Sequence, residues 1–509
     1  MRWAILPRED WRLVLGGALL TALAYPPFHL LFPSFLALVP VTWLLLRLGD
    51  APGAARRMLV CGFWYGLLSQ GLVLYWIVVA LWHFTPLSAL GYAATIAILA
   101  GYSALVFAGA AWIRARVGVP LALGLPVLWT AAEWLIAHQG DIRFPWLGLG
   151  TSLTGYPTLV QVADLIGARG VTFLLVAANV ALAEAWLLRA HRAAVVRRVG
   201  VVMLGVTLVT GYGVLRARAV VLRDVGTVAV IQPNVGFDDK WMPGTRDSLM
   251  SALLTLSDRA VAATSPDLVV WPEAAVPGTF YNRPSWRRAL EQHVARYGVP
   301  AVVGALDAEL RGENEFAYYN AAFVVDHLGN SRSAPVYHKR YLVPITERVP
   351  FVTPEWFGNL EFFGGAEPGR SGPVYATRIG RFGILICYES IFENLAREYR
   401  RDGAEFLLNI TNDAWFGRSS APRQHLAHLV MRAIETRAGI ARAANTGISA
   451  FIDPLGRIHD PTPLFEEAFA ARVLTTSDER TVYVRLGDWV GLTSVIGAVL
   501  LVAYARWRR

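Results

Sequence analysis

The sequence predicts a membrane domain of about eight transmembrane helices joined to an α/β domain outside the cytoplasm. Three observations predict this fold class. Of the 509 residues, 55% are hydrophobic and only 17% are charged, a composition too apolar for an ordinary soluble protein. Seven long apolar runs fill the first part of the chain, and one more precedes the C-terminus. Between them, short strand-like runs alternate with amphipathic helical patterns.

The apolar runs set the expected domain boundaries, because a helix needs about 20 apolar residues to cross the hydrocarbon core of a membrane. We therefore expect a seven-span membrane domain at 1–218, an α/β domain at 219–485 and a C-terminal transmembrane helix at 486–509. The predicted spans lie near 10–25, 28–46, 58–81, 86–113, 120–137, 169–188, 199–215 and 489–507.

The arginines beside the spans predict the orientation of the chain. With a cytoplasmic N-terminus, fifteen arginines lie in cytoplasmic segments, whereas the short loops on the other side hold only Arg143 and Arg169. Basic residues next to spans are retained on the cytoplasmic side of a membrane. The rule thus predicts cytoplasmic termini and places residues 219–485 outside the cytoplasm.

The segment 219–485 has the pattern of a layered α/β domain. Two turn sequences, DHLGN (326–330) and DPLGR (453–457), predict hairpins and therefore mixed sheets. The predicted buried strands are 227–232, 267–271, 300–306, 320–326, 382–387 and 405–410. The predicted helices lie near 245–264, 284–297, 390–401 and 422–443.

Composition also excludes several classes of protein. The net charge of +9 does not indicate nucleic-acid binding, because the arginines lie mostly beside the apolar runs. Two cysteines are too few for a disulfide framework, and Cys61 lies within an apolar run, so any cysteine chemistry falls to Cys387. No cluster of histidine, cysteine or aspartate has metal-ligand spacing, and we expect neither a metal nor a cofactor.

Cys387 is the candidate nucleophile. It ends the apolar run FGILIC, and a helix-like segment follows it directly. A turn from strand to helix exposes a nucleophile and points backbone N–H groups at its surroundings, which stabilises a thiolate and later an oxyanion. The alternative is a buried structural cysteine, the commoner case for a lone cysteine, but the position at a strand end argues against it.

Glu273 and Lys339 are the candidate partners of Cys387. Glu273 follows the strand-like LVVW, where a carboxylate is poorly solvated, as suits a general base, although it could also be a helix-start carboxylate. Lys339 is one of only two lysines among 47 basic residues, the other being Lys240. A retained lysine indicates a need for a compact ammonium rather than a guanidinium; a solvated surface lysine is the alternative. His338 is a poor candidate, because neighbours in a strand point to opposite faces.

Three motifs carry a resemblance to a known superfamily. WPEAAVP with Glu273, YHKRYLVPITE with Lys339 and GILICYE with Cys387 resemble, in this order, the motifs of the nitrilase superfamily, whose catalytic triad is Glu, Lys and Cys. The resemblance implies an α-β-β-α sandwich in residues 219–485.

The whole chain resembles the apolipoprotein N-acyltransferase family, which places a nitrilase-like domain between seven spans and one span. NITNDAWFG (409–417), Gln424 and His425 in the helix that follows it, and EWLIAHQGDIRFPW (133–146) also resemble the lipid-modifying branch of the superfamily. The family implies a multi-pass protein of the bacterial inner membrane, with the catalytic domain facing the periplasm. It also implies two partners, a phospholipid acyl donor such as phosphatidylethanolamine and a diacylated apolipoprotein acceptor.

The resemblance implies a role for each matching residue. Glu273 is the base, Lys339 stabilises the oxyanion and Cys387 forms an acyl thioester. Handling of the substrate or support of the site falls to four residues, Trp241, Glu347, Tyr388 and Glu389. We expect a monomer, since nothing in the sequence demands more.

Two other functions share parts of this pattern. A membrane-bound carbon–nitrogen or ester hydrolase of the same superfamily would use the same triad with water in the second step. A transporter or receptor with a ligand-binding outer domain would share the spans, and its function would not depend on Cys387.

Overall fold

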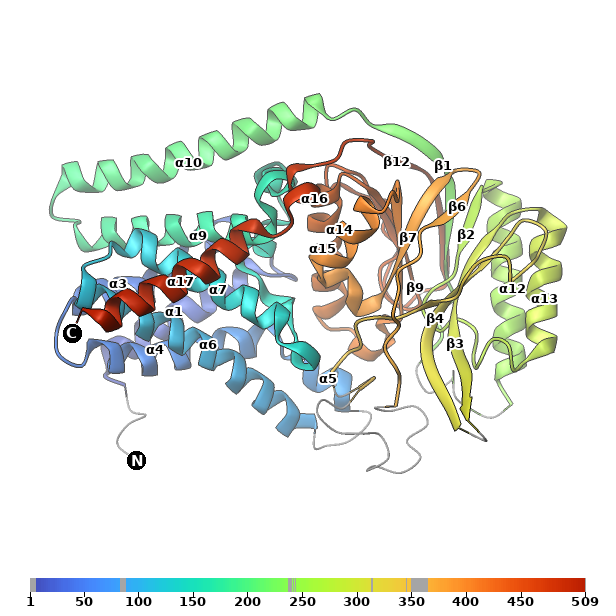
Figure 1. Ribbon diagram of the computed structural model, residues 1–509, viewed down its shortest axis with the longest axis horizontal. Helices are drawn as coiled ribbons and strands as arrows, with labels where there is room; N and C mark the ends of the chain where they lie inside the picture. Colours follow the sequence, from blue (N-terminus) through green and yellow to red (C-terminus); the bar gives the residue numbers. More distant parts are fainter. Residues whose placement is uncertain are drawn as a thin grey trace.

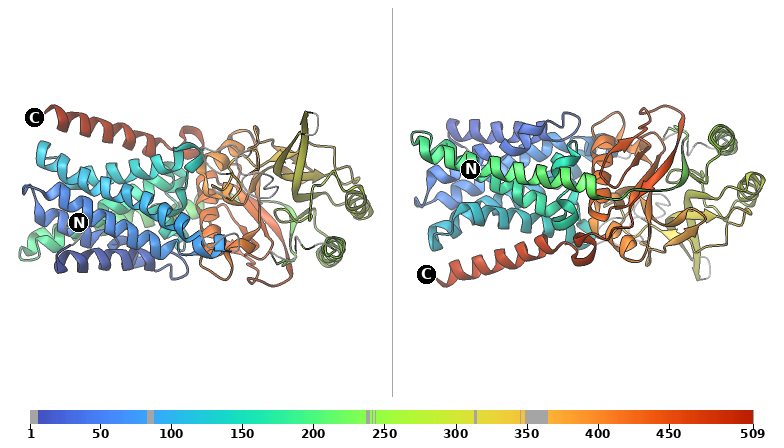
Figure 2. Two further views of the ribbon diagram at one scale, coloured as in Figure 1. Left: turned by 90° about the horizontal axis from the view of Figure 1, so that it is seen from below. Right: turned by 90° about the horizontal axis from the view of Figure 1, so that it is seen from above.

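The computed structural model describes residues 6–82, 88–236, 240, 242, 244–312, 315–344, 346–348 and 365–508. The described chain forms two parts that lie end to end, a bundle of long helices and a sandwich of two β-sheets with helices on its outer faces (Figure 1). The chain leaves the bundle through α10, builds the sandwich and returns to the bundle in α17. The end of α17 lies at the far end of the bundle from the sheets (Figure 2).

The helical bundle contains the predicted apolar runs. Its α-helices are α1 Arg8–Ala24, α2 Leu31–Leu36, α3 Val39–Leu48, α4 Ala54–Val73, α5 Trp76–Trp82, α6 Ser88–Val117, α7 Leu121–His138, α8 Pro157–Val160, α9 Ala163–Leu187, α10 Arg192–Ala219 and α17 Trp489–Trp507. Short 3-10 helices connect α7 to α8, namely η1 Gly140–Ile142, η2 Pro145–Leu147 and η3 Leu149–Leu153.

Several of these helices have the length and composition of membrane spans. Within the described residues, six helical segments are long and apolar enough to cross a membrane, or seven if α4 and α5, bent by 57°, form one broken span. Helix α1 coincides with the first predicted span but has 17 residues, fewer than the about 20 that a span needs. The count of eight spans therefore stays a prediction.

The sandwich consists of two mixed six-stranded sheets. The first has the order β12-β1-β2-β3-β4-β5 and the second the order β11-β10-β9-β8-β7-β6. The strands of the first sheet are β1 Arg223–Gln232, β2 Leu268–Val270, β3 Ala301–Gly312, β4 Glu315–Val325, β5 Tyr337–His338 and β12 Ala468–Thr476. Those of the second are β6 Tyr375–Thr377, β7 Gly380–Ile386, β8 Phe406–Thr411, β9 Gly439–Ala444, β10 Ala450–Ile452 and β11 Ile458–His459.

Helices cover the outer face of each sheet, so the layers follow the order α-β-β-α. Helices α12 Arg246–Thr264 and α13 Pro284–Tyr297 cover the first sheet, on the side away from the bundle (Figure 1). Helices α14 Glu393–Arg401 and α15 Ala421–Thr436 cover the second sheet, and α15 also contacts α9 of the bundle. This layer therefore lies between the second sheet and the apolar helices.

The six strands predicted from the sequence are confirmed as β1, β2, β3, β4, β7 and β8. These strands read as continuous apolar runs because both faces of the central strands are covered; every residue of β8, for example, is buried. The turn at 453–457 joins the antiparallel strands β10 and β11, whereas other pairs, such as β7 and β8, are parallel. The prediction of mixed sheets is therefore also confirmed.

The predicted helix near 422–443 is wrong in its last part. Helix α15 ends at Thr436, because Arg437 adopts a left-handed conformation with φ of 52°, and residues 439–444 form strand β9. The sequence of this strand, GIARAA, is buried on both faces and rich in alanine. It is therefore poor in β-branched residues and lacks the alternation of apolar and polar residues by which a strand is recognised.

Candidate active site

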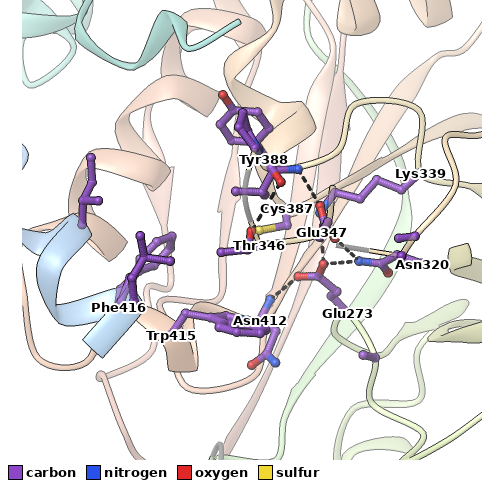
Figure 3. Close-up of a pocket in the computed structure, with 18 of the residues that line it drawn as sticks. Glu273, Asn320, Lys339, Thr346, Glu347, Cys387, Tyr388, Asn412, Trp415 and Phe416 are labelled. Atoms are coloured by element: carbon purple, nitrogen blue, oxygen red, sulfur yellow. Dashed lines mark hydrogen bonds and ion pairs between the residues drawn. The ribbon is translucent and has the colours of Figure 1, made fainter. Parts of the chain in front are cut away.

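The three predicted catalytic residues come together at one cavity between the two sheets and the bundle. Cys387 begins the 3-10 helix η5 Cys387–Ile391 directly after β7, Glu273 follows β2, and Lys339 follows β5. All three line a cavity of about 1070 Å³, and their side chains point into it toward one another (Figure 3). The prediction that these residues converge is supported by this arrangement.

Glu273 is buried and held from three directions. One carboxylate oxygen, Oε1, accepts hydrogen bonds from the side-chain amide of Asn320 at 2.6 Å and from the Lys339 ammonium at 3.3 Å. The other, Oε2, accepts from the backbone N–H of Asn412 at 2.7 Å. These contacts orient the carboxylate toward the cavity, which a positioned general base requires.

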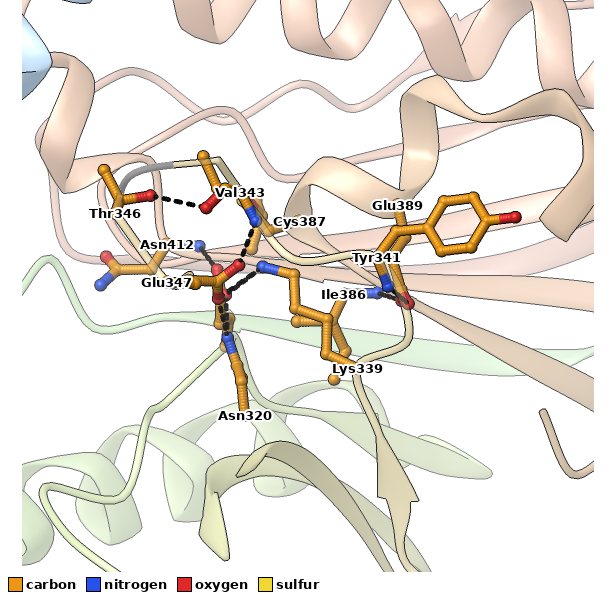
Figure 4. Close-up of polar contacts among 12 residues, drawn as sticks. Asn320, Lys339, Tyr341, Val343, Thr346, Glu347, Ile386, Cys387, Glu389 and Asn412 are labelled. Carbon is orange, nitrogen blue, oxygen red and sulfur yellow. Dashed lines mark hydrogen bonds and ion pairs between the residues drawn. The ribbon is translucent and has the colours of Figure 1, made fainter. Parts of the chain in front are cut away.

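Lys339 is 1% exposed and lies between two carboxylates. Its ammonium donates to Oε1 of Glu347 at 2.8 Å in addition to Glu273, and Asn320 also bridges the two carboxylates (Figure 4). Burial alone would lower the pKa of the lysine, but Glu347 and Glu273 outweigh burial and raise it above its usual range. Lys339 is therefore charged and able to stabilise a developing oxyanion.

Glu347 ties this group to the loop that follows β5. Its second oxygen, Oε2, accepts from the backbone N–H of Val343 at 2.7 Å. Glu347 therefore forms an ion pair with Lys339 and a backbone contact four residues upstream.

Cys387 stands on a strained turn. Its φ of 50° lies in the left-handed region, which a residue with a side chain rarely adopts unless its surroundings enforce it. Burial raises the pKa of the thiol above its usual range; Glu273 adds to this effect and Lys339 opposes it. The resting thiol is therefore protonated at neutral pH, and its attack on a substrate requires a base, for which Glu273 is in place.

Glu389 lies behind the nucleophile, not among the described residues that line the cavity. Its carboxylate accepts from the backbone N–H groups of Ile386 at 2.7 Å, Arg340 at 2.7 Å and Tyr341 at 3.2 Å (Figure 4). The Tyr337 hydroxyl donates to it as well, at 2.8 Å. Glu389 thus connects the end of β7, directly before Cys387, to the residues that directly follow Lys339.

Tyr388 connects the nucleophile loop to the bundle. Its hydroxyl donates to the backbone carbonyl of Arg143 at 2.7 Å, and its ring stacks on Phe144 at 6.3 Å between ring centres. Both partners belong to the segment 133–146, whose sequence resembles the lipid-modifying branch of the superfamily. Tyr388 also lines the cavity.

The buried side chain of His425 contacts the backbone of Cys387. His425 contacts the backbone carbonyl of Cys387 at 3.0 Å and the Ser390 hydroxyl at 2.9 Å through Nε2. Its Nδ1 lies 3.1 Å from Asp413, which is paired with the buried Arg442 at 2.7 Å. Sequence reasoning marked His425 and the segment 409–417, which contains Asp413, only by resemblance. It missed Arg442, because nothing in the spacing of the chain shows that these side chains meet.

Three further residues, namely His338, Asn320 and Trp241, bear on how well the site could be predicted. His338 points away from the nucleophile: its Nε2 contacts Asp307 at 2.8 Å and its ring stacks on Tyr319, so the expectation that neighbours face opposite ways is confirmed. Asn320 was missed, because an asparagine in a strand carries no sequence signal of its own. Trp241 lies outside the described residues.

One wall of the cavity is formed by the bundle. Trp76 and Ile77 of α5, and Ile98 and Leu99 of α6, line it together with Phe416. Ile98 is 55% exposed, so the apolar wall continues to the outer surface of the bundle. The arrangement combines a cysteine nucleophile, a base and a buried cation with a space suited to a long hydrocarbon chain.

Comparison with known proteins extends over the whole chain. The family model for carbon-nitrogen hydrolase matches residues 227–478, and that for the apolipoprotein N-acyltransferase N-terminal domain matches residues 17–181. The chain is 34% identical to the apolipoprotein N-acyltransferase of Geobacter metallireducens, in an alignment that covers 99% of this chain and 96% of that protein. It is 31% identical to the enzyme of that name from Methylococcus capsulatus, with 98% and 96% covered.

Among solved structures, the chain is similar to an amidase from Nesterenkonia sp. The alignment covers 53% of this chain and 95% of the amidase, with 18% identity and a TM-score of 0.39. This likeness is too distant to bear on the fold or the activity.

Proposed function

The chain belongs to the apolipoprotein N-acyltransferase family, and on that premise we propose that Cys387 carries the acyl group between its two lipid substrates. The enzyme transfers a fatty acyl chain from a phospholipid to the N-terminal α-amine of diacylglyceryl-cysteine in apolipoproteins. The single observation that carries the residue assignment is the contact of Lys339 with both Glu273 and Glu347 beside a buried, strained cysteine.

The first half-reaction transfers the acyl chain to the enzyme. The Glu273 carboxylate takes the proton of the Cys387 thiol as the sulfur attacks the ester carbonyl of the phospholipid. The oxyanion that forms lies near the Lys339 ammonium, which is already charged and needs no reorganisation. The intermediate collapses with release of the glycerol oxygen, which receives the proton from Glu273, and a lysophospholipid leaves.

The second half-reaction regenerates the thiol. The neutral α-amine of the acceptor attacks the thioester, and Glu273 takes a proton from the attacking nitrogen. The sulfur leaves and receives that proton, so an amide has replaced a thioester. A thioester is activated enough to acylate an amine, whereas the starting oxygen ester is not, and the covalent intermediate thus divides one difficult step into two.

The apolar wall of the cavity supports a lipid substrate. An acyl chain whose carbonyl carbon lies at Cys387 can extend along α5 and α6 and remain out of water, at a gain of about 0.8 kcal/mol for each buried CH₂ group. Water remains a competing acceptor for the thioester, so exclusion of water by this wall favours transfer over hydrolysis.

The placement of the enzyme in the membrane is part of the proposal. We infer eight spans, a membrane domain at 1–218, a catalytic domain at 219–485 facing the periplasm and a C-terminal span at 486–509, in a monomer that binds no nucleic acid. The distribution of arginines supports this orientation. Trp241 is proposed to contact substrate, as its motif implies.

Mass spectrometry of the purified enzyme tests the proposal. Incubation with phosphatidylethanolamine should add one acyl chain to Cys387, and only a diacylated lipopeptide should remove it. The Cys387→Ser variant should fold and form no thioester. Rapid release of free fatty acid without an acceptor would instead identify a hydrolase, and function that survives Cys387→Ser would indicate a transporter or receptor.

A further inference from the structure

The cavity at Cys387 also has a cationic end, on the side of the first sheet. Arg246, the first residue of α12, and Arg283, the residue before α13, line it there together with Asn282. The apolar wall from α5 and α6 lines the other end. Glu273, Lys339 and Cys387 follow strands of the two sheets, which lie between α12 and α13 on one side and the bundle on the other (Figure 1).

The two arginines are the cavity's unbalanced charges. Glu273, Lys339 and Glu347 pair with one another. In the part of the chain that the structure describes, neither arginine forms an ion pair with a carboxylate, and the Nε of Arg246 is buried without a hydrogen-bond partner.

The described neighbours of the two arginines leave both guanidinium groups without an ion pair. Arg283 lies over the ring of Trp286, 5.1 Å from its centre. Asp247, next to Arg246, accepts a hydrogen bond from the Trp286 indole at 2.5 Å instead. Both guanidinium groups therefore remain available to an anion.

The ends of two helices add to this positive charge. Helix α12 has 19 residues and helix α13 has 14. The N-terminus of a helix carries unpaired N–H groups and a partial positive charge. Guanidinium groups at two such ends form a site suited to an anion with several acceptor oxygens, such as a phosphodiester.

We propose, building on the function proposed above, that Arg246 and Arg283 form a subsite for the phosphodiester of the donor phospholipid. The ester that reacts lies between an acyl chain and a glycerophosphate, and the cavity presents an apolar wall, the nucleophile and the two arginines in the same order. The acceptor carries its diacylglyceryl group on a thioether and has no phosphate there. The pair therefore serves the first half-reaction and distinguishes the donor from the acceptor.

Single-turnover acylation of Cys387 tests this subsite. The full-length wild-type enzyme, in detergent, should acylate much faster with phosphatidylethanolamine than with a diacylglycerol of the same chains. The Arg246→Gln/Arg283→Gln variant should lose about 10-fold or more with phosphatidylethanolamine, the value expected for charge-assisted hydrogen bonds. Its rate with diacylglycerol should stay unchanged, and Arg246→Lys/Arg283→Lys should recover part of the loss.

A matched variant controls for the loss of charge and for folding. Arg259 and Arg288 lie exposed on the same two helices, α12 and α13, outside the cavity. The Arg259→Gln/Arg288→Gln variant removes the same charge and should acylate like the wild type with both donors. An equal loss in this variant would overturn the proposal, because a general effect of charge would then explain the result.

The second half-reaction separates the remaining outcomes. Acyl-enzyme prepared by long incubation and freed of donor should be discharged by a diacylated lipopeptide at the same rate in the wild type and in the Arg246→Gln/Arg283→Gln variant. Slower discharge with normal acylation would overturn the subsite and assign the arginines to the acceptor peptide. A wild-type enzyme that forms no acyl-Cys387 at all would refute the proposed function itself.

Discussion

The side chain of Glu389 connects the segment before Cys387 to the segment after Lys339. It accepts hydrogen bonds from the backbone on both sides, before the cysteine and after the lysine. Burial raises the pKa of this carboxyl, and the N–H donors act to lower it. Its position is therefore determined by acceptor geometry, since three of its donors are backbone N–H groups that cannot move aside.

Replacement of Glu389 by glutamine should damage both stability and activity. The amide places an N–H where the carboxylate accepted hydrogen bonds, which leaves at least one buried donor unpaired at about 1–3 kcal/mol. We expect a lower melting temperature and acyl-Cys387 formation reduced by about 10-fold or more. Glu398→Gln is the control, because Glu398 is a partly exposed partner of Arg340; an equal effect there would contradict the assigned role.

The raised pKa of Cys387 leads to a prediction about pH. A thiol whose pKa lies above its usual range is almost fully protonated at pH 7–9, and its thiolate fraction rises about tenfold with each pH unit. Glu273→Gln removes the base, so its acylation rate should be low at pH 7 and rise about tenfold per unit to pH 9. The wild type should change little over that range, because Glu273 accepts the proton. Equal slopes for both enzymes would argue against Glu273 as the base.

At the scale of elements, the side chain of Gln424 contacts the break between α4 and α5. The break leaves the carbonyl of Val73 without a helical partner, and the Gln424 amide donates to it and to the Pro26 carbonyl, at 3.1 Å each. The Gln424 oxygen accepts from the indoles of Trp76 at 3.0 Å and Trp146 at 2.9 Å. Helix α15 thus fixes the short helix that forms the apolar wall, while the next residue supports the nucleophile.

Gln424→Leu should therefore impair acylation beyond its cost in stability. Loss of these hydrogen bonds leaves two carbonyls and two indoles unpaired and frees α5 to shift, so both the melting temperature and the rate of acyl-Cys387 formation should fall.

Gln161→Leu is the matched control for this substitution. Gln161 is also buried between the bundle and the sandwich, where it donates to the Leu455 carbonyl at 2.8 Å and accepts from Arg437. Its replacement should lower the melting temperature with little change in the acylation rate measured well below unfolding. Equal losses of rate in both variants would contradict a specific role for Gln424.

At the scale of the whole molecule, buried polar contacts join the bundle to the sandwich. Arg437 of the sandwich pairs with Asp164 of the bundle at 2.7 Å, and both side chains are at most 1% exposed. Arg169 of α9 pairs with Glu393 of α14. Loss of one partner of a buried ion pair strongly destabilises a protein, so these contacts stabilise the relative position of the two parts.

The proposed orientation predicts which surfaces an impermeant reagent can reach. Arg288 is exposed on α13 and Ala190 is exposed between α9 and α10, and both native cysteines are buried. In intact spheroplasts, an impermeant maleimide should label Arg288→Cys and leave Ala190→Cys unlabelled until the cells are lysed. The reverse pattern would invert the orientation.

Much of the fold could be predicted, because the predicted strands and helices reflect local patterns. Among the strands that were not predicted, β9 is buried on both faces and poor in β-branched residues, and β5 is only two residues long. The catalytic candidates Glu273, Lys339 and Cys387 were recognisable, because each ends or follows a strand and each belongs to a motif.

The sequence by itself determined the classes of the two parts, the order of the motifs and the identity of the catalytic candidates, since these depend on composition and local pattern. Only the tertiary structure decided which side chains contact and orient the catalytic candidates. The hydrogen bond between Glu273 and Asn412 joins residues 139 positions apart in the sequence, and that between Gln424 and Pro26 joins residues 398 positions apart. Arg246 and Arg283 join the same cavity as α5 and α6. Such contacts arise from packing between distant elements, and no local pattern records them.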